Sequence, residues 1–324
     1  MIYVLLILGF FLLIKGADIL VEGSTTLAKH FGISNIVIGL TVVAFGTSMP
    51  ELIVNILSSV SGASGISIGN IVGSNIANIL LILGASALIT TIKVQKNTVW
   101  KEIPFSLLAV LILFILSNDN ISDNNLLGTL SKNDGFILIF FFIIFLYYTY
   151  SISRSQKILL PNLEKKINLK KSVFYIMMGI VALFIGGKWV VDSAVQIAKL
   201  FNISETIIGI SVVAIGTSLP ELVTSIVAGF KKNSDIAIGN IVGSNIFNIF
   251  WVLGLSSIIS PINIGADSLI DFKVLIIASV LLFIFLFLDK KNIRFRPDNF
   301  EINKVKGILF LVIYFVYLVI RFRG

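Results

Sequence analysis

The sequence lacks cysteine and has little histidine or charge. The 324 residues include no cysteine and a single histidine, His30. The chain therefore cannot form a disulfide framework, a thiolate metal site or a histidine-based zinc centre. Charged residues make up 13% of the chain, about half the share of a typical soluble domain. The hydrophobic share is 56% and the mean hydropathy is +1.01. This composition excludes an ordinary soluble domain and indicates an integral membrane protein.

About ten apolar runs are long enough to cross a bilayer, which takes roughly 20 helical residues. Backbone polar groups find no water in lipid, so each run must form a helix, or a broken helix that lines a cavity. The sequence therefore predicts an all-α integral membrane protein with ten transmembrane helices. They lie near residues 2–28, 34–60, 66–91, 98–117, 135–152, 173–200, 204–229, 236–260, 268–288 and 304–321.

A basic linker at 153–171 divides these spans into five and five. We expect a first five-helix repeat at 1–152 and a second at 172–324. Connections after odd-numbered spans carry 18 Lys and Arg residues, and the opposite side carries 5. The positive-inside rule then places the linker in the cytoplasm and both termini outside. The first span has no basic leader or cleavage site, so we expect it to be retained, and compact loops indicate a prokaryotic plasma membrane.

An internal repeat is the strongest signal in the chain. Residues 34–84 and 204–254 align without a gap and are identical at 28 of 51 positions. The repeat unit contains five spans, and an odd number makes the second copy enter the membrane from the other side. Two inverted-topology five-helix repeats are typical of secondary transporters, whose binding site lies at the repeat interface near the midplane.

Each copy centres on a short motif, Gly-Thr-Ser-Met-Pro-Glu at 46–51 and Gly-Thr-Ser-Leu-Pro-Glu at 216–221. Pro50 has no N–H for the carbonyl of Gly46, and its ring crowds that turn. We therefore expect broken helices in spans 2 and 7. The break would leave free carbonyls around 44–46, at the partially negative end of the first half-helix, where they could bind a cation.

Oxygen-bearing residues recur at helical spacing around each motif. Positions 44, 47, 48 and 51 share one helix face, and positions 74 and 78 share a face of the next span. The candidate metal site combines both copies: Glu51, Glu221, Thr47, Thr217, Ser48, Ser218, Ala44, Ala214, Ser74, Ser244, Asn78 and Asn248. Oxygen ligands with two carboxylates suit a hard cation such as Ca²⁺ or Na⁺.

The charge of the two glutamates indicates exchange. A charge of −2 neutralises one Ca²⁺ or two Na⁺, and ions that exclude each other from a shared site can be exchanged. A single Pro-Glu could mark a kink beside a water pocket, but a buried carboxylate is costly in a membrane. Two copies at equivalent positions therefore favour the ion site.

Other polar and small residues in the spans have a structural alternative. We interpret Gly69-xxx-Gly73 and its copy at 239–243 as packing motifs that bring spans 2 and 3 together. The asparagines at 70, 75, 240 and 245 could be ligands, but interhelical hydrogen bonds are the favoured interpretation. Lys15 and Asp18 could neutralise each other or lie along the ion path.

At these motifs the sequence resembles the sodium/calcium exchanger family, within the calcium/cation antiporter superfamily. The resemblance covers residues 39–51 with 69–78, and 209–221 with 239–248. It implies ten helices, an ion core of spans 2, 3, 7 and 8, and spans 1 and 6 that slide across this core.

The resemblance also implies roles for the site residues. Glu51 and Glu221 would be the central ligands, with calcium bound through the backbone carbonyls of Thr47 and Thr217. Some microbial members and the potassium-dependent branch have Asp where this chain has Asn248. Asn leaves two carboxylates in the core instead of three, which argues against potassium co-transport here. Asn78 and Asn248 would flank the centre. The residues that would line the sodium sites are Ala44, Ser48, Ser74, Ala214, Ser218 and Ser244.

The sequence thus predicts a secondary active antiporter that exchanges Na⁺ for Ca²⁺ across the membrane by alternating access, with Ca²⁺ export as the expected direction. An H⁺/Ca²⁺ antiporter is the alternative, since glutamates also bind protons, and a passive cation channel is a further one. No zinc-protease motif or other intramembrane enzyme motif is present, so we expect no enzymatic activity. The expected partners are Ca²⁺, Na⁺ and the lipid bilayer, with no cofactor, nucleic acid or protein partner.

Overall fold

The structure is a computed structural model that describes residues 2–62, 64–118, 126–155, 168–200, 214–265, 268–287 and 300–323. Parts of two predicted regions lie outside these residues. They are 156–167 of the linker predicted at 153–171, and 204–213 of the seventh span predicted at 204–229.

The described residues form mainly helices, some of which contain π-helical turns, labelled η. The outer helices are α1 (Ile2–Phe31), η3 (Thr98–Glu102) with α7 (Ile103–Leu116), α8 (Lys132–Ser155), α9 (Leu169–Leu200), α15 (Ser268–Phe287) and α16 (Lys304–Arg323). The first sequence repeat forms α2 (Asn35–Ile38), η1 (Gly39–Val43), α3 (Ala44–Thr47), α4 (Met49–Val60), α5 (Ser64–Ile76), η2 (Ala77–Ile82) and α6 (Leu83–Ile89). The second forms α11 (Ala214–Thr217), α12 (Leu219–Phe230), α13 (Ser234–Ile246), η5 (Phe247–Leu253) and α14 (Gly254–Ile259).

Seven helical stretches of the described chain are long and apolar enough to cross a membrane. The bent pair Asn35–Thr47 and Met49–Val60 raises this to eight if it forms one span. The chain is therefore a helical integral membrane protein, as its composition predicts. The number of ten spans stays a prediction.

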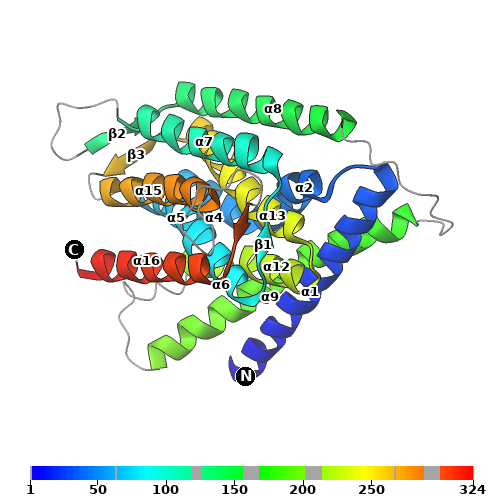
Figure 1. Ribbon diagram of the computed structural model, residues 1–324. Helices are drawn as coiled ribbons and strands as arrows, with labels where there is room; N and C mark the ends of the chain where they lie inside the picture. Colours follow the sequence, from blue (N-terminus) through cyan, green and yellow to red (C-terminus); the bar gives the residue numbers. More distant parts are fainter. Residues whose placement is uncertain are drawn as a thin grey trace.

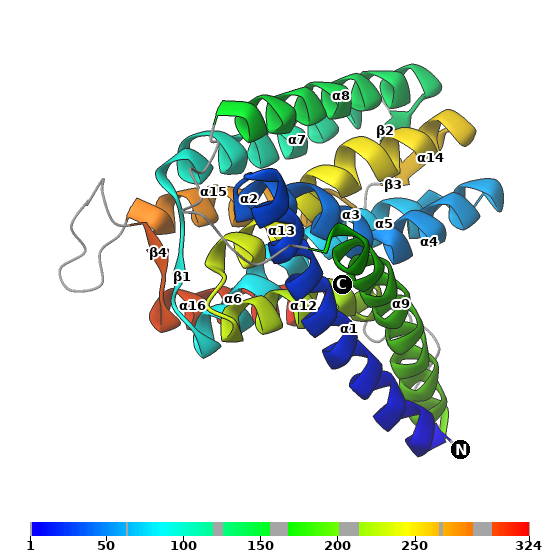
Figure 2. The ribbon, with the colours of Figure 1, turned by 90° about the vertical axis from the view of Figure 1, so that its right-hand side faces the viewer.

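The helices surround a central group that carries the two motifs (Figures 1 and 2). The central helices α4, α5, α12 and α13 pack against one another, and α7 with α8 cover one side. The helices α15 and α16 lie on another side, while α1 and α9 run together as a long tilted pair (Figure 2). A separate hydrophobic cluster joins this pair to the central helices, through residues such as Leu20, Leu183 and Ile38.

Glycines spaced seven residues apart allow α1 and α9 to approach closely. Added Cβ atoms on Gly9 and Gly16 would lie 3.0 Å from the carbonyl oxygens of Gly186 and Gly179, respectively. A Cβ on Gly23 would lie 2.9 Å from the carbonyl oxygen of Ser172. Because the two backbones touch here, as in small-residue seams between membrane helices, α1 and α9 form one tightly packed unit.

Two short β-ladders join connecting segments that the sequence analysis treats as loops. Strand β1 (Ile92–Lys93) pairs antiparallel with β4 (Glu301–Ile302), and β2 (Leu126–Leu130) pairs antiparallel with β3 (Ile262–Gly265). Each ladder joins one segment of the first half of the chain to one of the second. The strands form because buried apolar residues, such as Ile92 and Ile262, anchor the segments beside each other.

The glycine seam predicts unequal effects for two neighbouring substitutions. A Cβ on Gly186 would lie 2.8 Å from the carbonyl oxygen of Gly9, whereas the nearest atom to one on Gly187 is 3.8 Å away. We expect Gly186→Ala to destabilise the protein by about 1–3 kcal/mol, as overpacking does. Thermal unfolding in detergent should show a lower midpoint for Gly186→Ala and an unchanged or slightly higher one for Gly187→Ala. Equal midpoints for both variants would contradict the close contact.

Candidate ion-binding site

Both motifs lie where a helix breaks. The first helix bends by 47° between Thr47 and Met49, and Ser48 has ψ 9°, outside the helical range. In the second copy Ser218 has ψ 5° between α11 and α12. Pro50 and Pro220 lie in the first turn of the helix that follows, where a missing N–H is tolerated. The predicted break in span 2 is present, and in the second copy the chain before α11 lies outside the described residues.

The two motif glutamates are fully buried, and serines of both copies hold each of them. Oε1 of Glu51 accepts a hydrogen bond from Ser74 of its own copy at 3.3 Å and from Ser218 of the other at 3.4 Å. The second copy repeats this arrangement: Oε1 of Glu221 accepts from Ser244 at 3.3 Å and from Ser48 at 2.9 Å. The two carboxylates are therefore held in one site by crossed contacts between the halves of the chain.

Four acceptor oxygens in this region have no hydrogen-bond donor in the structure. They are Oε2 of Glu51, Oε2 of Glu221, Oδ1 of Asn78 and Oδ1 of Asn248. All four residues are at most 1% exposed. Burying a carboxylate or amide oxygen without a partner is costly, and a cation coordinated by these oxygens would remove that cost. Carboxylate and amide oxygens are the ligand types that Ca²⁺ and Na⁺ accept.

The asparagines use their N–H groups to connect the two copies. Nδ2 of Asn78 donates to Oδ1 of Asn245 at 2.9 Å, and Nδ2 of Asn248 donates to Oδ1 of Asn75 at 3.0 Å. Asn75 itself donates to the carbonyl oxygen of Asn245 at 3.1 Å. These contacts bear out the interhelical role predicted for Asn75 and Asn245. Asn78 and Asn248 lie in η2 and η5, and π-helical turns are frequent at functional sites.

The threonines of the motifs contact the other pair of asparagines. Oγ1 of Thr47 donates to Oδ1 of Asn240 at 3.0 Å, and Oγ1 of Thr217 donates to Oδ1 of Asn70 at 3.3 Å. Asn70 also donates to the buried Asn55 at 2.7 Å, a residue that the sequence analysis did not single out. Its polar side chain in an apolar span was the available signal.

Ala44 and Ala214 lie beside the helix breaks, but the expectation that the break leaves the carbonyl of Ala44 free is wrong. Ala44 is buried at the start of α3, and Ala214 begins α11. The carbonyl of Ala44 accepts the N–H of Ser48 at 3.0 Å and Oγ1 of Thr47 at 3.3 Å, so the break does not leave it free. The proline removes the partner of the Gly46 carbonyl instead, because Pro50 has no N–H.

The glycine motif of the second copy packs differently from the prediction. A Cβ on Gly239 would lie 3.0 Å from the Cα of Gly39, and one on Gly243 would lie 2.7 Å from the carbonyl oxygen of Leu40. These glycines therefore bring α13 against η1 of the first copy, rather than joining neighbouring spans of one copy. The contact is possible because neither Gly39 nor Gly239 has a side chain.

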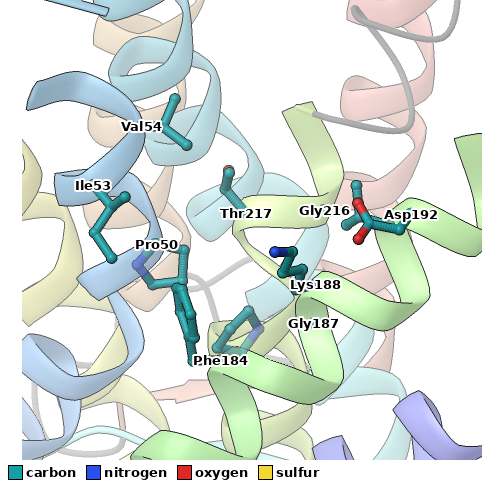
Figure 3. Close-up of a pocket in the computed structure, with 11 residues that line it drawn as sticks. Pro50, Ile53, Val54, Phe184, Gly187, Lys188, Asp192, Gly216 and Thr217 are labelled. Atoms are coloured by element: carbon teal, nitrogen blue, oxygen red, sulfur yellow. The ribbon is translucent and has the colours of Figure 1, made fainter. Parts of the chain in front are cut away.

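A cavity of about 290 Å³ lies beside the two broken helices (Figure 3). Pro50, Pro220 and Thr217 line it from the motifs, and Lys188 and Asp192 line it from α9. Figure 3 shows Lys188 reaching from α9 into the space between the two motifs. Pro50 and Pro220 directly precede Glu51 and Glu221, so the cavity lies next to the region of the site.

Asp18 of the first span has a partner that the sequence analysis did not foresee. Its Oδ1 accepts the ammonium group of Lys231, at 2.7 Å, in the connection between α12 and α13. The predicted neutralisation within the first span, by Lys15, is therefore replaced by a contact between α1 and the central helices.

The comparison with protein families decides the classification. The family model described as "Sodium/calcium exchanger protein" matches residues 1–151 and 171–323. The chain belongs to the sodium/calcium exchanger family. It is therefore a member of a family of cation transporters, and the resemblance seen in the motifs is confirmed.

Individual relatives of this family cover nearly the whole chain. Sodium/calcium exchanger MaX1 of Methanosarcina acetivorans is 33% identical over 99% of this chain and 98% of its own length. Inner membrane protein YrbG of Escherichia coli is 37% identical over 86% of each chain. Among solved structures, the sodium-calcium exchanger NCX_Mj superposes with a TM-score of 0.81 and 35% identity, over 98% of this chain and 97% of that one.

The buried oxygens predict that Ca²⁺ stabilises the protein through the two glutamates. We expect Ca²⁺ to raise the midpoint of thermal unfolding in detergent, because a ligand that binds the folded state stabilises it. Glu51→Gln and Glu221→Gln should weaken apparent Ca²⁺ binding by at least about tenfold, since each removes one of two charges facing the cation. Glu301→Gln, which removes a carboxylate in β4, should bind Ca²⁺ like the wild type. Normal Ca²⁺ binding by both site variants would refute the assignment.

Proposed function

We propose that the protein is a Na⁺-driven Ca²⁺ antiporter that exports Ca²⁺ by alternating access. The observation that carries this proposal is the set of four buried, unpartnered oxygens on Glu51, Glu221, Asn78 and Asn248. Two carboxylates balance one Ca²⁺ or two Na⁺. The site therefore favours occupation by one kind of ion at a time, which is the physical basis of exchange.

The proposal also assigns a role to each of the remaining predicted ligands. In it, the backbone carbonyls of Thr47 and Thr217 complete the calcium site together with the two glutamates. The serines that contact the glutamates, with Ala44 and Ala214, line the sodium sites. Because Na⁺ and Ca²⁺ then share both carboxylates, the arrival of one ion weakens the hold on the other. These serines are Ser48, Ser74, Ser218 and Ser244.

We also propose that ten helices form two inverted five-helix repeats, 1–152 and 172–324, around this site. The crossed Ser–Glu contacts support this arrangement, since each has a counterpart 170 residues along the chain. The paired ladders β1–β4 and β2–β3 support it as well, because each joins the two halves. In this arrangement, the α1–α9 unit slides across the central helices.

The proposed orientation places both termini and the cavity of Figure 3 at the outer face. The charge count puts the connection after α4 outside, and the cavity lies along α4 and the second half of α9. The site would then be reached from outside in this conformation. Lys93, Lys96 and the linker 153–171 would lie in the cytoplasm.

Proteoliposomes test the ion coupling. Vesicles loaded with Na⁺ should take up Ca²⁺ when diluted into Na⁺-free medium, while matched vesicles loaded with choline at equal pH should not. Glu51→Gln, reconstituted at equal protein density, should lose this uptake. Ca²⁺ uptake driven by a pH gradient without Na⁺ would instead identify an H⁺/Ca²⁺ antiporter. Uptake that follows the membrane potential and needs no counter-ion would identify a channel.

The absence of native cysteine makes the orientation testable by single-cysteine labelling. Val54 lines the cavity and Lys96 is exposed in the connection that follows β1. In intact cells, a membrane-impermeant maleimide should modify Val54→Cys, and should modify Lys96→Cys only after the membrane is permeabilised. The reverse pattern would overturn the proposed orientation. The cysteine-free wild type provides the background.

A further inference from the structure

A second cavity, of about 510 Å³, lies at the opposite end of the central helices from the one in Figure 3. Its walls come from the end of α1, the start of α2, the segment around β1 and the connection between α12 and α13. The residues that line it are Thr25, Lys29, Asn35, Lys93, Val94, Gln95, Lys231, Lys232, Asn233, Ser234 and Asp235. We call it the basic cavity.

Four lysines from three separate parts of the chain, the end of α1, strand β1 and the connection after α12, line this cavity together with one carboxylate. Asp235 accepts a hydrogen bond from Gln95 at 2.7 Å, and Lys231 is paired with Asp18. Within the described residues, no ion pair involves Lys29, Lys93 or Lys232. Three ammonium groups therefore surround one space that holds a single carboxylate, that of Asp235, which leaves an excess of two positive charges. Their mutual repulsion would be relieved by a bound anion.

Lys232, which lines the basic cavity, adopts a backbone conformation that favours glycine. Lys232 has φ 56°, and its N–H donates to the carbonyl of Gly229 at 2.9 Å. The first copy makes the same turn 170 residues earlier with Gly62, at φ 75°, bonded to Ser59. Glycine adopts this left-handed conformation freely, whereas lysine does so at a cost. The second copy thus keeps a costly lysine where the cavity lies.

We propose that the basic cavity binds a phosphate group, either on the headgroup of an anionic lipid or as free phosphate. Lysine is a common phosphate ligand as a point charge, and lysines near a membrane surface attract anionic headgroups. The connections that supply these lysines follow odd-numbered spans, on the side that the charge count assigns to the cytoplasm. A phosphate there balances the ammonium groups of Lys29, Lys93 and Lys232.

The cavity bridges parts of the molecule that the proposed exchange mechanism moves relative to each other. Lys29 and Thr25 belong to α1, whereas Lys93 and Lys232 belong to segments attached to the central helices. Asn233 already joins the two parts by donating to Thr25 at 3.2 Å. A phosphate held by lysines from both parts adds a second link and slows exchange. This regulatory role rests on the proposed function, whereas phosphate binding itself does not.

A binding experiment with two matched triple variants tests the site. The shift in thermal unfolding midpoint is measured in detergent against short-chain phosphatidic acid, inorganic phosphate and short-chain phosphatidylcholine. Lys29→Gln with Lys93→Gln and Lys232→Gln should weaken phosphatidic acid binding by at least about tenfold. The control triple, Lys96→Gln with Lys101→Gln and Lys304→Gln, removes the same charge from exposed lysines outside the cavity and should bind like the wild type.

Each outcome of this experiment has a defined meaning. Binding of phosphatidic acid alone identifies a lipid headgroup as the source, and binding of inorganic phosphate as well supports the phosphate group as sufficient. Equal weakening in both triple variants would overturn the proposal, because it would reflect only the general charge of that face. No binding, or equal binding of phosphatidylcholine, would overturn it too.

A flux measurement separates this proposal from the proposed function. In phosphatidylcholine vesicles, added phosphatidic acid should lower the initial rate of Na⁺-driven Ca²⁺ uptake for the wild type and the control triple, and leave the cavity triple unaffected. An unchanged rate for the wild type would overturn the regulatory role. Complete absence of Na⁺-driven uptake in phosphatidylcholine alone would refute the proposed function, while the binding result would stand.

Discussion

Two carboxylates buried in the interior of a membrane protein must be neutralised, and the central structure is organised around this need. Glu51 and Glu221 are fully buried, and the described residues bring no lysine or arginine into an ion pair with either. Hydroxyl groups satisfy one oxygen of each carboxylate and leave the other without a donor. A cation is the ordinary way to complete such a site, since hydrogen bonds to neutral groups cannot balance two charges.

A network of hydrogen bonds between the two copies holds these oxygens in position. Ser48 and Ser218 each donate a hydrogen bond to the glutamate of the other copy. Asn78 and Asn248 donate their N–H groups to Asn245 and Asn75, which leaves their own amide oxygens available. Preorganised ligands lower the cost of binding. In the proposed function, Na⁺ and Ca²⁺ share the same two carboxylates, so a Na⁺-filled and a Ca²⁺-filled site are alternatives. Within the proposed mechanism, the tight α1–α9 unit would then give each state access to one side of the membrane.

Much of this arrangement could be predicted from the sequence, because the decisive signals are local. Pro50 beside Glu51 predicts a broken helix that carries a carboxylate, and the second copy of the motif predicts that two such helices form one ion site. The partners of the glutamates across the copies could not be predicted, since Ser48 and Glu221 are 173 residues apart and their contact depends on packing. The glycine seam was visible as Gly9, Gly16 and Gly23 at intervals of seven, but its meaning required the antiparallel partner helix. The ladders escaped prediction because strands of two to five residues have no pattern of their own.

Equilibrium Ca²⁺ binding at increasing Na⁺ concentration tests the central claim, that Na⁺ and Ca²⁺ share the two carboxylates. The titration uses purified protein in detergent, with choline replacing Na⁺ to hold the ionic strength constant. Competition for shared ligands predicts that the apparent Kd for Ca²⁺ keeps rising with Na⁺ and does not level off. A Kd that reaches a plateau, or that does not respond to Na⁺, would show that the ions do not exclude each other from one site and would contradict the account.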